Sequence, residues 1–407
     1  MKVDFPSSFF TANRQNLRNL VGDKPIIVSA NGLLQKGVDS AYPFHQDANF
    51  WYLTGINDPG IVLVITGIWD FLILPKRSDY QDTFEGTINK KTLIKMSGVT
   101  GVLSFEEGWK EVDRLLGISK KVATITPFDN YIEFYGMYTN PGRRQLIKRI
   151  KAIDKKIPIE NIVPNITELR IIKQPIEVKA ISAAIDITSQ AIKAVKSNLG
   201  KLSHEYSAES VITAHFINNN VINAWKPIIA SGHNACILHY DDNTNRLVKN
   251  DLVVVDIGAE VSHYAADITR TLIIGAKPSA RQREVHRAVL DVQNYAIKLQ
   301  KPGVTVFDNE KKIRKYMATK LIELGLIKRA SRAEINKFYP HSTSHFLGLE
   351  PHDVGDYKLP LKPGAVLTVE PGIYIPQENI GVRLEDDVLI TATGCKVLSA
   401  ALSRDLL

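Results

Sequence analysis

The sequence predicts two domains, an α/β domain in residues 1–165 and a larger α+β domain in residues 166–407. Short apolar runs alternate with helical segments in the first part of the chain. The stretch from residue 157 to 175 then contains three prolines and no sustained periodicity, which is typical of a domain boundary. Helices and paired strands follow, and about the last 70 residues return to short strands and turns.

The first domain is expected to be built on short buried strands. Three apolar runs bounded by Gly, Pro or Asp predict such strands at residues 25–30, 60–65 and 70–75. Residues 146–154 have the apolar spacing of a helix. The segment FWYLTGI, residues 50–56, places three aromatic residues beside a glycine. We expect it to be a buried strand, with a ligand-facing site as the alternative.

Four helices are predicted in the second domain. The first begins at Pro175, carries apolar residues three, four and seven positions apart, and ends at Gly200. Ser279 and Gln282 form a capping box at the start of the third. The four predicted helices cover residues 175–199, about 206–219, 280 to about 302, and about 307–324.

Two paired strands are predicted in residues 252–274, and each contains one carboxylate, Asp256 or Asp267. A turn centred on Val261 and Ser262 would place the two aspartates directly opposite each other, with Cβ atoms about 5 Å apart on one face. Such a pair of like charges is unfavourable unless a cation lies between them. The predicted turn lacks the Asn-Gly or Gly-rich residues that a two-residue hairpin prefers, and a bulge would shift the pairing by one residue.

Composition excludes several classes of protein. Apolar residues make up 44% and charged residues 23% of the chain, as in an ordinary globular protein. No apolar run approaches the ~20 residues that span a bilayer, and the N-terminal segment lacks the apolar core of a signal peptide, so we expect a cytoplasmic protein without membrane contact. The net charge of +8 divides evenly between the two predicted domains, which argues against a nucleic-acid partner. Two distant cysteines, Cys236 and Cys395, predict no disulfide framework.

Three further fragments place ionisable groups among apolar residues. PHSTSHFLGLEPHDVG contains His341, His345 and His352, VLTVEPGIYIP contains Glu370, and GVRLEDDVLIT contains Arg383 and Glu385. Taken singly, these residues have ordinary explanations as core histidines, a turn residue and a surface ion pair. Taken together with the two aspartates, they give four carboxylates within strand-like apolar runs and one adjacent cation. Buried carboxylates cannot all stay ionised without compensation, so we predict bound metal ions.

Four carboxylates and one histidine form an oxygen-rich ligand set, which suits Mn²⁺, Mg²⁺ or Fe²⁺ better than a structural zinc site, although Zn²⁺ and Co²⁺ also fit the chemistry. Two such ions about 3.5–4 Å apart hold a water or hydroxide as nucleophile and polarise a carbonyl or phosphoryl oxygen. Hydrolysis is therefore the expected reaction.

These motifs resemble those of a known superfamily. VDIGAEVSHYAADITRT, HSTSHFLGLEPHDVG, VEPGIYI and GVRLEDDVLIT, in this order, closely resemble the dinuclear metallopeptidases of pita-bread fold, which include methionine aminopeptidases, Xaa-Pro aminopeptidases and Xaa-Pro dipeptidases. The segment YPFHQDANFWYLTGINDPG, residues 42–60, resembles the Xaa-Pro aminopeptidase (aminopeptidase P) family in particular. The resemblance implies a creatinase-like α/β N-terminal domain and a pita-bread catalytic domain.

The resemblance also implies the metal ligands. Asp256 and Asp267 would bind metal, with Asp267 bridging the two ions. His345 and Glu370 would be terminal ligands of one ion, and Glu385 would bridge both. Glu370 would in addition act as the catalytic proton shuttle. The expected cofactor is a pair of divalent ions, with Mn²⁺ first and Zn²⁺, Co²⁺ or Fe²⁺ as alternatives.

Further site residues are implied by matching motifs. His239 and His352 match the catalytic histidines that stabilise the carbonyl oxygen and the tetrahedral intermediate. The substrate-binding or metal-surrounding residues would be His341, Arg383, Tyr374 and Trp51, the last reaching the site of a neighbouring subunit. Arg383 would orient carboxylates.

The expected function is that of a metal-dependent aminopeptidase that releases the N-terminal residue from peptides with proline in second position, through a metal-bridging hydroxide. An Xaa-Pro dipeptidase is the alternative from the same superfamily. A non-catalytic pita-bread binding module is a further alternative, which the complete ligand set disfavours. The N-terminal domain is expected to serve oligomerisation and substrate access in a homodimer or homotetramer.

Overall fold

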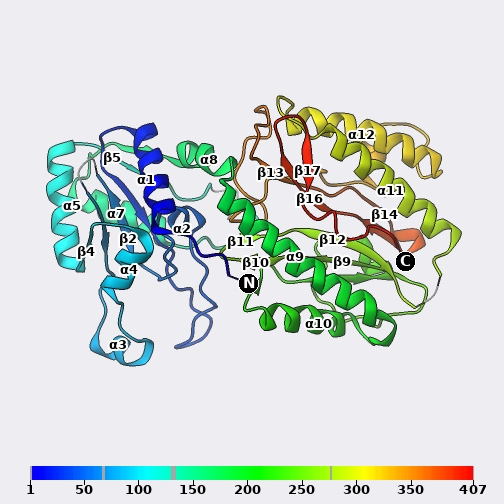
Figure 1. The fold of residues 1–407 in the computed structure, drawn as a ribbon, viewed down its shortest axis with the longest axis horizontal. Helices are drawn as coiled ribbons and strands as arrows, with labels where there is room; N and C mark the ends of the chain where they lie inside the picture. The colour runs from blue at the N-terminus through cyan, green and yellow to red at the C-terminus, as the bar shows by residue number, and fades with distance from the viewer. Residues whose placement is uncertain (1, 67–68, 130–133, 276, 407) are drawn as a thin grey trace. The chain divides into compact units, whose positions relative to one another are not determined.

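The computed structural model of the chain describes residues 2–66, 69–129, 134–275 and 277–406. These residues form two compact units, shown in Figure 1. One unit is Phe5–Leu169, and the other is Arg170–Leu407 together with Met1–Asp4. Within the described residues, no helix has both the length and the apolar composition needed to cross a membrane.

The first unit is built on one mixed sheet. Its strands are β1 (Ile26–Ser29), β2 (Val62–Ile65), β3 (Asp70–Ile73), β4 (Gly101–Leu103), β5 (Val122–Thr124) and β6 (Ile159–Asn161), in the order β4-β3-β2-β1-β5-β6. β1 is antiparallel to β2 and parallel to β5. The three strands predicted from apolar runs are thus confirmed, and they lie next to one another in the middle of the sheet.

The first unit also contains helices. They are α1 (Ser7–Val21), α2 (Ala48–Thr54), α3 (Asp79–Glu85), α4 (Lys90–Ser97), α5 (Phe105–Ser119), α7 (Gly142–Ile153) and α8 (Val163–Ile171), the last of which runs into the second unit. Val112 and Leu116 of α5 and Leu146 and Ile150 of α7 are buried against the strands in one apolar cluster. The helix predicted at residues 146–154 is therefore confirmed.

The prediction of a strand at residues 50–56 is wrong, because this segment forms helix α2. The Asp47 side chain accepts hydrogen bonds from the backbone N–H groups of Asn49 and Phe50, and Gly55 ends the helix in a left-handed conformation. Every residue of α2 is buried, so its sequence lacks the polar face by which an amphipathic helix is recognised. The capping interactions of Asp47 and Gly55 favour a helix here, although aromatic residues are common in strands.

The second unit contains strands in four small sheets. The strands are β7 (Ile222–Asn223), β8 (Ile228–Ser231), β9 (Leu252–Ile257), β10 (Ala259–Val261), β11 (Tyr264–Ala265), β12 (Ile268–Ile273), β13 (Val366–Val369), β14 (Gly372–Ile375), β15 (Ile380–Arg383), β16 (Asp386–Ile390) and β17 (Cys395–Val397). Their orders are β11-β10-β7, β12-β9-β8, β13-β16-β17 and β14-β15.

Two pairs of helices enclose these strands (Figure 1). The helices of this unit are α9 (Pro175–Asn198), α10 (Glu205–Asn218), α11 (Ala280–Leu299), α12 (Val306–Glu323) and the short α13 (Arg332–Asn336). α9 and α10 pack on the sheets that contain β7 to β12, and α11 packs on β13, β14 and β15. The four predicted helices are confirmed, including the Ser279–Gln282 capping box of α11.

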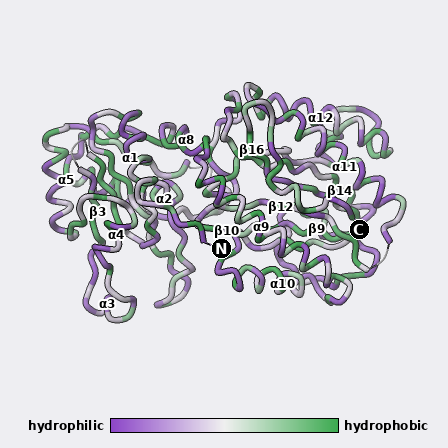
Figure 2. Tube along the Cα trace, viewed as in Figure 1, coloured by the Kyte–Doolittle hydropathy of each residue, from purple (hydrophilic) through white to green (hydrophobic). Residues whose placement is uncertain are grey.

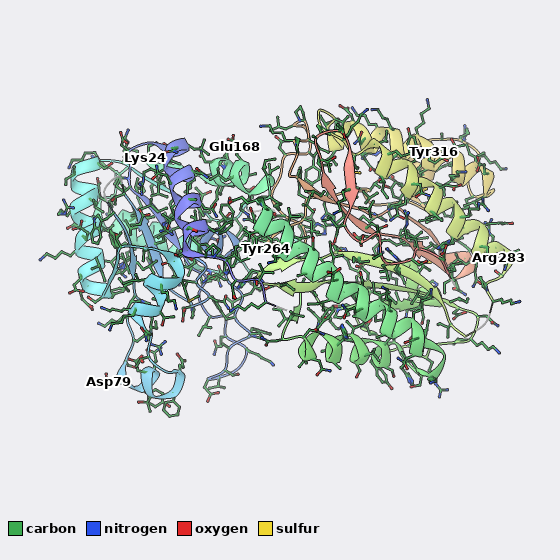
Figure 3. The ribbon with its side chains drawn as sticks, in the orientation of Figure 1. Lys24, Asp79, Glu168, Tyr264, Arg283 and Tyr316 are labelled. Carbon is green, nitrogen blue, oxygen red and sulfur yellow. The ribbon has the colours of Figure 1, made fainter. Side chains whose placement is uncertain are left out.

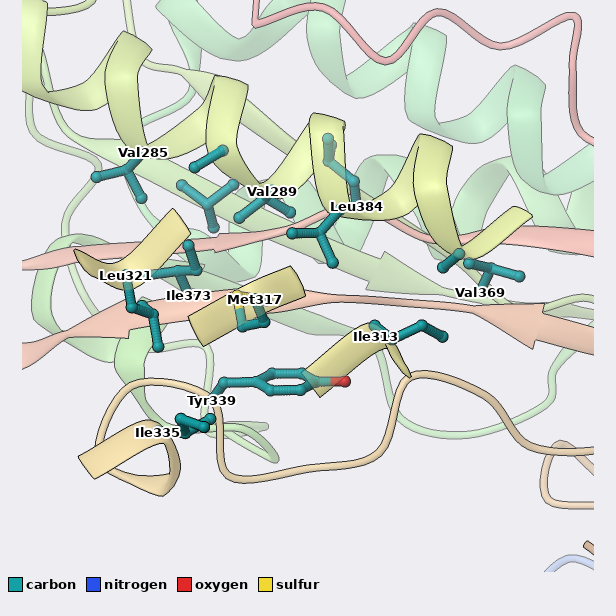
Figure 4. Close-up of a cluster of buried hydrophobic side chains, with 14 of the residues drawn as sticks. Val285, Val289, Ile313, Met317, Leu321, Ile335, Tyr339, Val369, Ile373 and Leu384 are labelled. Atoms are coloured by element: carbon teal, nitrogen blue, oxygen red, sulfur yellow. The ribbon is translucent and has the colours of Figure 1, made fainter. Parts of the chain in front are cut away.

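The core of this unit lies between α11, α12 and the last strands. Val289 of α11 and Met317 of α12 are buried with Val369 and Ile373, as Figure 4 shows. Along α11 hydrophobic and hydrophilic residues alternate within each turn (Figure 2), as expected of a helix with one buried face. This packing fixes the strand ends that carry the ionisable groups.

The hairpin register differs from the prediction. Asp256 pairs with Thr269, and Val261 pairs with Tyr264, so the turn consists of Ser262 and His263. Both turn residues have positive φ, 50° and 67°, which is the conformation that best matches the twist of two-residue hairpins. The turn thus lies one residue later than predicted, and the pairing shifts by two residues. Because side chains alternate with a period of two, this shift leaves Asp256 and Asp267 on one face as diagonal neighbours.

Hydrogen bonds from the N-terminal segment and from α9 hold the hairpin in place. The Ser262 hydroxyl accepts from the N–H of Val3 at 3.2 Å and donates to its carbonyl at 2.8 Å. Tyr264 lies beside α9 (Figure 3), where its hydroxyl donates to Glu177 Oε1 at 2.8 Å. These bonds stabilise a turn whose residue types do not favour it.

Candidate metal centre

The predicted ligands lie at the ends of neighbouring strands. Asp256 is near the end of β9, and Asp267 directly precedes β12. Val369 of β13 pairs with Asp386 of β16, so Glu370 follows this pair on one strand and Glu385 precedes it on the other. His345 lies in the loop before β13, beside Phe346, which bridges to Leu367. The fold therefore brings five residues from distant parts of the chain together.

Short distances join these groups. His345 Nε2 lies 3.5 Å from Asp267 Oδ2 and 3.4 Å from Glu370 Oε1. One potential ligand atom each from Asp267, His345 and Glu385 lies within 4.8 Å of the others, and all three residues are buried. The Glu370 side chain keeps 18% of its surface exposed, so it is accessible to a substrate.

Arg383 and Thr269 donate hydrogen bonds to two of the carboxylates, Asp256 and Glu385. Arg383 Nη2 donates to Asp256 Oδ2 at 2.6 Å, and its Nη1 donates to the Tyr374 hydroxyl at 3.1 Å. The Thr269 hydroxyl donates to Glu385 Oε2 at 2.6 Å. Asp256 Oδ1 is buried and has no hydrogen-bond partner among the described residues, which leaves it free to bind a cation.

The carboxylates destabilise one another's charges. Burial, followed by the charge of Asp256, raises the pKa of Glu385 to about 8. Burial and the charge of Glu385 raise the pKa values of Asp267 and Glu370 well above their ordinary range. Within this group of carboxylates the protein supplies one arginine, which is too little positive charge for all four to ionise at neutral pH. Divalent cations would reverse these shifts.

His345 is present in the form that binds metals. Burial, followed by the charge of His352, lowers the pKa of His345 to about 3, so the ring is neutral. Its Nδ1 lies 3.1 Å from the carbonyl oxygen of Phe346, a contact that requires the proton on Nδ1. The Nε2 lone pair then faces the oxygens of Asp267 and Glu370. A bound cation would be coordinated by all three of these groups.

Two of the three other predicted histidines, His352 and His341, lie beside this centre. The His352 ring stacks on the His345 ring, with 4.0 Å between centroids and 11° between planes. His341 Nε2 lies 2.9 Å from the Tyr374 hydroxyl, and burial lowers the pKa of His341 to about 3. His239 lies in the loop after η2 (Gly232–Cys236) and is exposed.

Trp51 belongs to the first unit. It lies on α2, is 5% exposed, and packs against the edges of Phe5 and Phe10 at centroid distances of 5.2 and 5.5 Å. Its predicted role at a neighbouring subunit's site stays a prediction.

Asp387 is a further buried carboxylate beside the candidate metal centre that was not predicted from the sequence. Its Oδ2 accepts from the backbone N–H of Asp267 at 3.1 Å, its buried Oδ1 has no hydrogen-bond partner among the described residues, and burial raises its pKa well above the ordinary range. Its neighbour Asp386 is paired with Arg270 at 2.7 Å. Three consecutive carboxylates in an apolar strand were the available signal, of which only Glu385 was used.

Family models match the part of the chain that carries these potential metal ligands. The model of metallopeptidase family M24 matches residues 179–392, which is more than half of the chain. The chain belongs to metallopeptidase family M24. In addition, the model of the aminopeptidase P N-terminal domain matches residues 10–124. The family predicted from the motifs is thereby confirmed.

Relatives within this family match most of the chain. An Xaa-Pro aminopeptidase of Haemophilus influenzae is 32% identical over 393 residues, covering 90% of this chain and 88% of its own. An Xaa-Pro dipeptidase of Pyrococcus furiosus is 36% identical over 279 residues, which cover 67% of this chain and 73% of its own.

Solved structures match over nearly the full length. Escherichia coli aminopeptidase P with the inhibitor Pro-Leu has a TM-score of 0.87 and 29% identity, covering 99% of this chain and 97% of the other. A zinc-substituted form of that enzyme in complex with product has a TM-score of 0.89 at 28% identity. The predicted fold class, with an α/β N-terminal domain and a pita-bread catalytic domain, is confirmed.

Proposed function

We propose that this chain is a metal-dependent aminopeptidase that hydrolyses the bond between an N-terminal residue and a following proline. The observation that carries the proposal is the convergence of four carboxylates and the His345 Nε2 lone pair with one arginine to compensate them. Membership of family M24 and the aminopeptidase P N-terminal match support the same activity.

Five residues would hold two divalent cations: Asp256, Asp267, His345, Glu370 and Glu385. The donor set fits such ions because it offers oxygen atoms in excess, including an orphaned buried oxygen of Asp256. When bound, such cations polarise the scissile carbonyl and provide a water-derived nucleophile at neutral pH. Mn²⁺ is the proposed ion, and a relative that accepts zinc supports a site that tolerates Zn²⁺.

The protein's own groups would then handle protons and the carbonyl oxygen. Glu370 is the partly exposed carboxylate of the set, so its oxygens can take a proton and return it to the leaving proline nitrogen. That nitrogen has no hydrogen of its own in the peptide bond, so its protonation is essential to release. His352 and His239 would donate hydrogen bonds to the carbonyl oxygen. Arg383 would keep Asp256 oriented, while His341 and Tyr374 would line the substrate pocket.

The test is a peptide-length series with Xaa-Pro, Xaa-Pro-Yaa and longer peptides, assayed with Mn²⁺, Zn²⁺ and Co²⁺ in turn. We expect release of the N-terminal residue from tripeptides and longer substrates. Cleavage of dipeptides alone would instead identify an Xaa-Pro dipeptidase, an alternative kept because of the Pyrococcus relative. Absence of any hydrolysis with all three metals would favour a non-catalytic binding module.

Three expectations from the sequence belong to the same proposal. The N-terminal unit would serve oligomerisation and substrate access, in a homodimer or homotetramer, and Trp51 would reach a neighbouring site there. The proposed partners are peptide substrates with proline in the second position and further copies of the chain, with no nucleic-acid or membrane partner. A cytoplasmic location is also proposed, although relatives include a mitochondrial peptidase of Arabidopsis thaliana.

A further inference from the structure

A fully buried glutamate outside the metal centre organises the loop that carries His239. Glu205 is the first residue of α10 and is 0% exposed. Among the described residues no ion pair compensates its charge. The carboxylate is instead surrounded by hydrogen-bond donors, all from residues 231–245.

The donors come from the start, middle and end of this loop. Glu205 Oε1 accepts from the N–H and hydroxyl of Ser231, at 2.8 and 2.7 Å, and from Asn234 Nδ2 at 3.2 Å. Its Oε2 accepts from the Tyr240 hydroxyl at 2.8 Å and from the N–H of Asn245 at 2.9 Å. Bonds to an ionised acceptor are stronger than those between neutral groups, so one carboxylate closes the loop upon itself.

Tyr240 connects this arrangement to the site. Its ring packs against the buried cluster that includes Ile228 and Val254, and its hydroxyl also accepts from the N–H of Thr244 at 3.2 Å. His239 precedes Tyr240 in the chain and is exposed. Tyr240 is therefore fixed toward the interior, and the neighbouring His239 is held on the outside of the loop.

The loop also packs against β15, a strand beside the candidate metal centre. Its helical turn η2 (Gly232–Cys236) packs on β15, which carries Arg383. Any side chain added at Gly381 would lie 2.1 Å from the carbonyl oxygen of Ala235. The backbone approach is thus close, and the loop is located by packing on one side and by Glu205 on the other.

We propose that Glu205 is a positioning residue for catalysis, which acts through Tyr240 to hold His239 against the substrate carbonyl. This inference rests on the proposed function, because it assigns the importance of Glu205 to one histidine of the proposed site. A loop fastened in advance loses no free energy to ordering when substrate binds. Loosening it would lower kcat/KM without changing the metal ligands.

The test uses Tyr240→Phe, which removes the hydroxyl and both of its hydrogen bonds, and Glu205→Gln, which keeps the shape but replaces an acceptor oxygen with an amide donor. Tyr206→Phe is the matched control, because Tyr206 is next to Glu205 but 51% exposed. We expect kcat/KM for an Xaa-Pro-Yaa peptide to fall about 5-fold in Tyr240→Phe and about 10- to 100-fold in Glu205→Gln. Tyr206→Phe should match the wild type, and bound metal should be unchanged in all three.

A general loss of structure is distinguished by repeating both substitutions in a His239→Ala background. If Glu205 acts through His239, neither substitution lowers kcat/KM further there. Effects that multiply with that of His239→Ala, or no effect of Glu205→Gln in the wild-type background, would overturn the proposal.

Hydrogen exchange of residues 231–245 provides a readout that does not depend on activity. We expect faster exchange in this segment for Glu205→Gln and unchanged exchange in the Tyr206→Phe control. Unchanged exchange in Glu205→Gln would also overturn the proposal. If the wild type cleaves no Xaa-Pro peptide, the proposed function fails and the catalytic role of Glu205 fails with it, whereas the exchange result still decides whether Glu205 holds the loop.

Discussion

Two groups of buried charged residues in the second unit differ in how their carboxylates are compensated. In the candidate metal centre, burial and the charge of Glu385 raise the pKa of Asp267, while burial and the charge of Asp256 raise the pKa of Glu385. Among the described residues, Arg383 is the cation that pairs with this group, through Asp256. Asp353, by contrast, accepts hydrogen bonds from Arg170 and, at 2.9 Å, from Lys173. Burial alone would raise the pKa of Asp353, but the charges of Arg170 and Lys173 lower it below its ordinary value.

The difference separates a structural cluster from a binding site. The Asp353 cluster contains its own compensating charges, so it is complete within the protein and fastens the loop that carries His352. In the candidate metal centre one arginine faces four carboxylates, so we expect its stability to depend on cations from solution. Burial of charge is common to both, and the missing counter-charge is what indicates function.

The largest expected effect is on activity in Asp267→Asn. Loss of this carboxylate should lower kcat/KM by about 1,000-fold or more, because several kcal/mol of metal-dependent stabilisation is lost. In EDTA the same variant should unfold at the wild-type temperature or above it, since one repelling charge has been removed. Assays with an Xaa-Pro-Yaa peptide and thermal unfolding measure both. Activity within 10-fold of the wild type would contradict the role proposed for Asp267.

An Asp→Asn substitution at Asp353 should instead destabilise the protein. Asp353→Asn removes the buried counter-charge of Arg170 and Lys173 and leaves the more exposed Glu350, 3.4 Å from Arg170, as the remaining ion-pair partner, so the free energy of unfolding should fall by about 3–5 kcal/mol. Urea unfolding in EDTA measures this. A loss below about 1 kcal/mol would mean that the cluster is not the structural element described here.

The pH dependence of stability should differ with and without metal. Glu385 has a folded-state pKa of about 8 and an ordinary value of 4.5, so its contribution to stability is complete below about pH 4.5 and is lost as pH rises toward 8. The EDTA-treated protein should therefore lose stability over this range. Bound metal favours the ionised carboxylates, so the difference in melting temperature between metal-loaded and EDTA-treated protein should grow with pH. Parallel pH profiles would contradict this.

A smaller effect is expected from Gly348→Ala. A Cβ at Gly348 would lie 2.1 Å from Asp353 Oδ2 and 2.8 Å from Lys173 Cε, so the ion pair must shift, at a cost of about 1–3 kcal/mol. Gly117→Ala is the control, because that position in α5 has open space. It should be neutral or stabilising by up to about 1 kcal/mol. Equal unfolding free energies for the two variants would show that Asp353 is not tightly held.

The fold could be predicted where hydrophobic periodicity was strong. β1, β2 and β3 and the helices α9 to α12 followed from apolar spacing and caps. The segment of α2 did not, because it is buried on all sides and shows no periodicity. The hairpin turn was placed one residue early, because Ser262 and His263 adopt a left-handed conformation that their residue types do not favour.

The candidate ligands could be predicted from local sequence, but the residues that hold them in place could not. A carboxylate within an apolar run can be recognised from the sequence alone, so the four proposed carboxylate ligands could be chosen in this way. His345 was added because its motif resembles that of the metallopeptidases. Partners that compensate or position them come from distant segments. Arg170 with Asp353 and Glu205 with Tyr240 are such pairs, and nothing in their local sequence indicates their contact.

The metal content of the purified protein tests the central claim most directly. After incubation with Mn²⁺ and removal of free ions, elemental analysis should find two ions per chain in the wild type and in Tyr206→Phe. Asp256→Ala, which removes an orphaned buried oxygen from the centre, should bind fewer than two and lose hydrolysis. A wild-type protein that binds no divalent ion, or an Asp256→Ala variant that keeps both ions and full activity, would contradict the dinuclear centre proposed here.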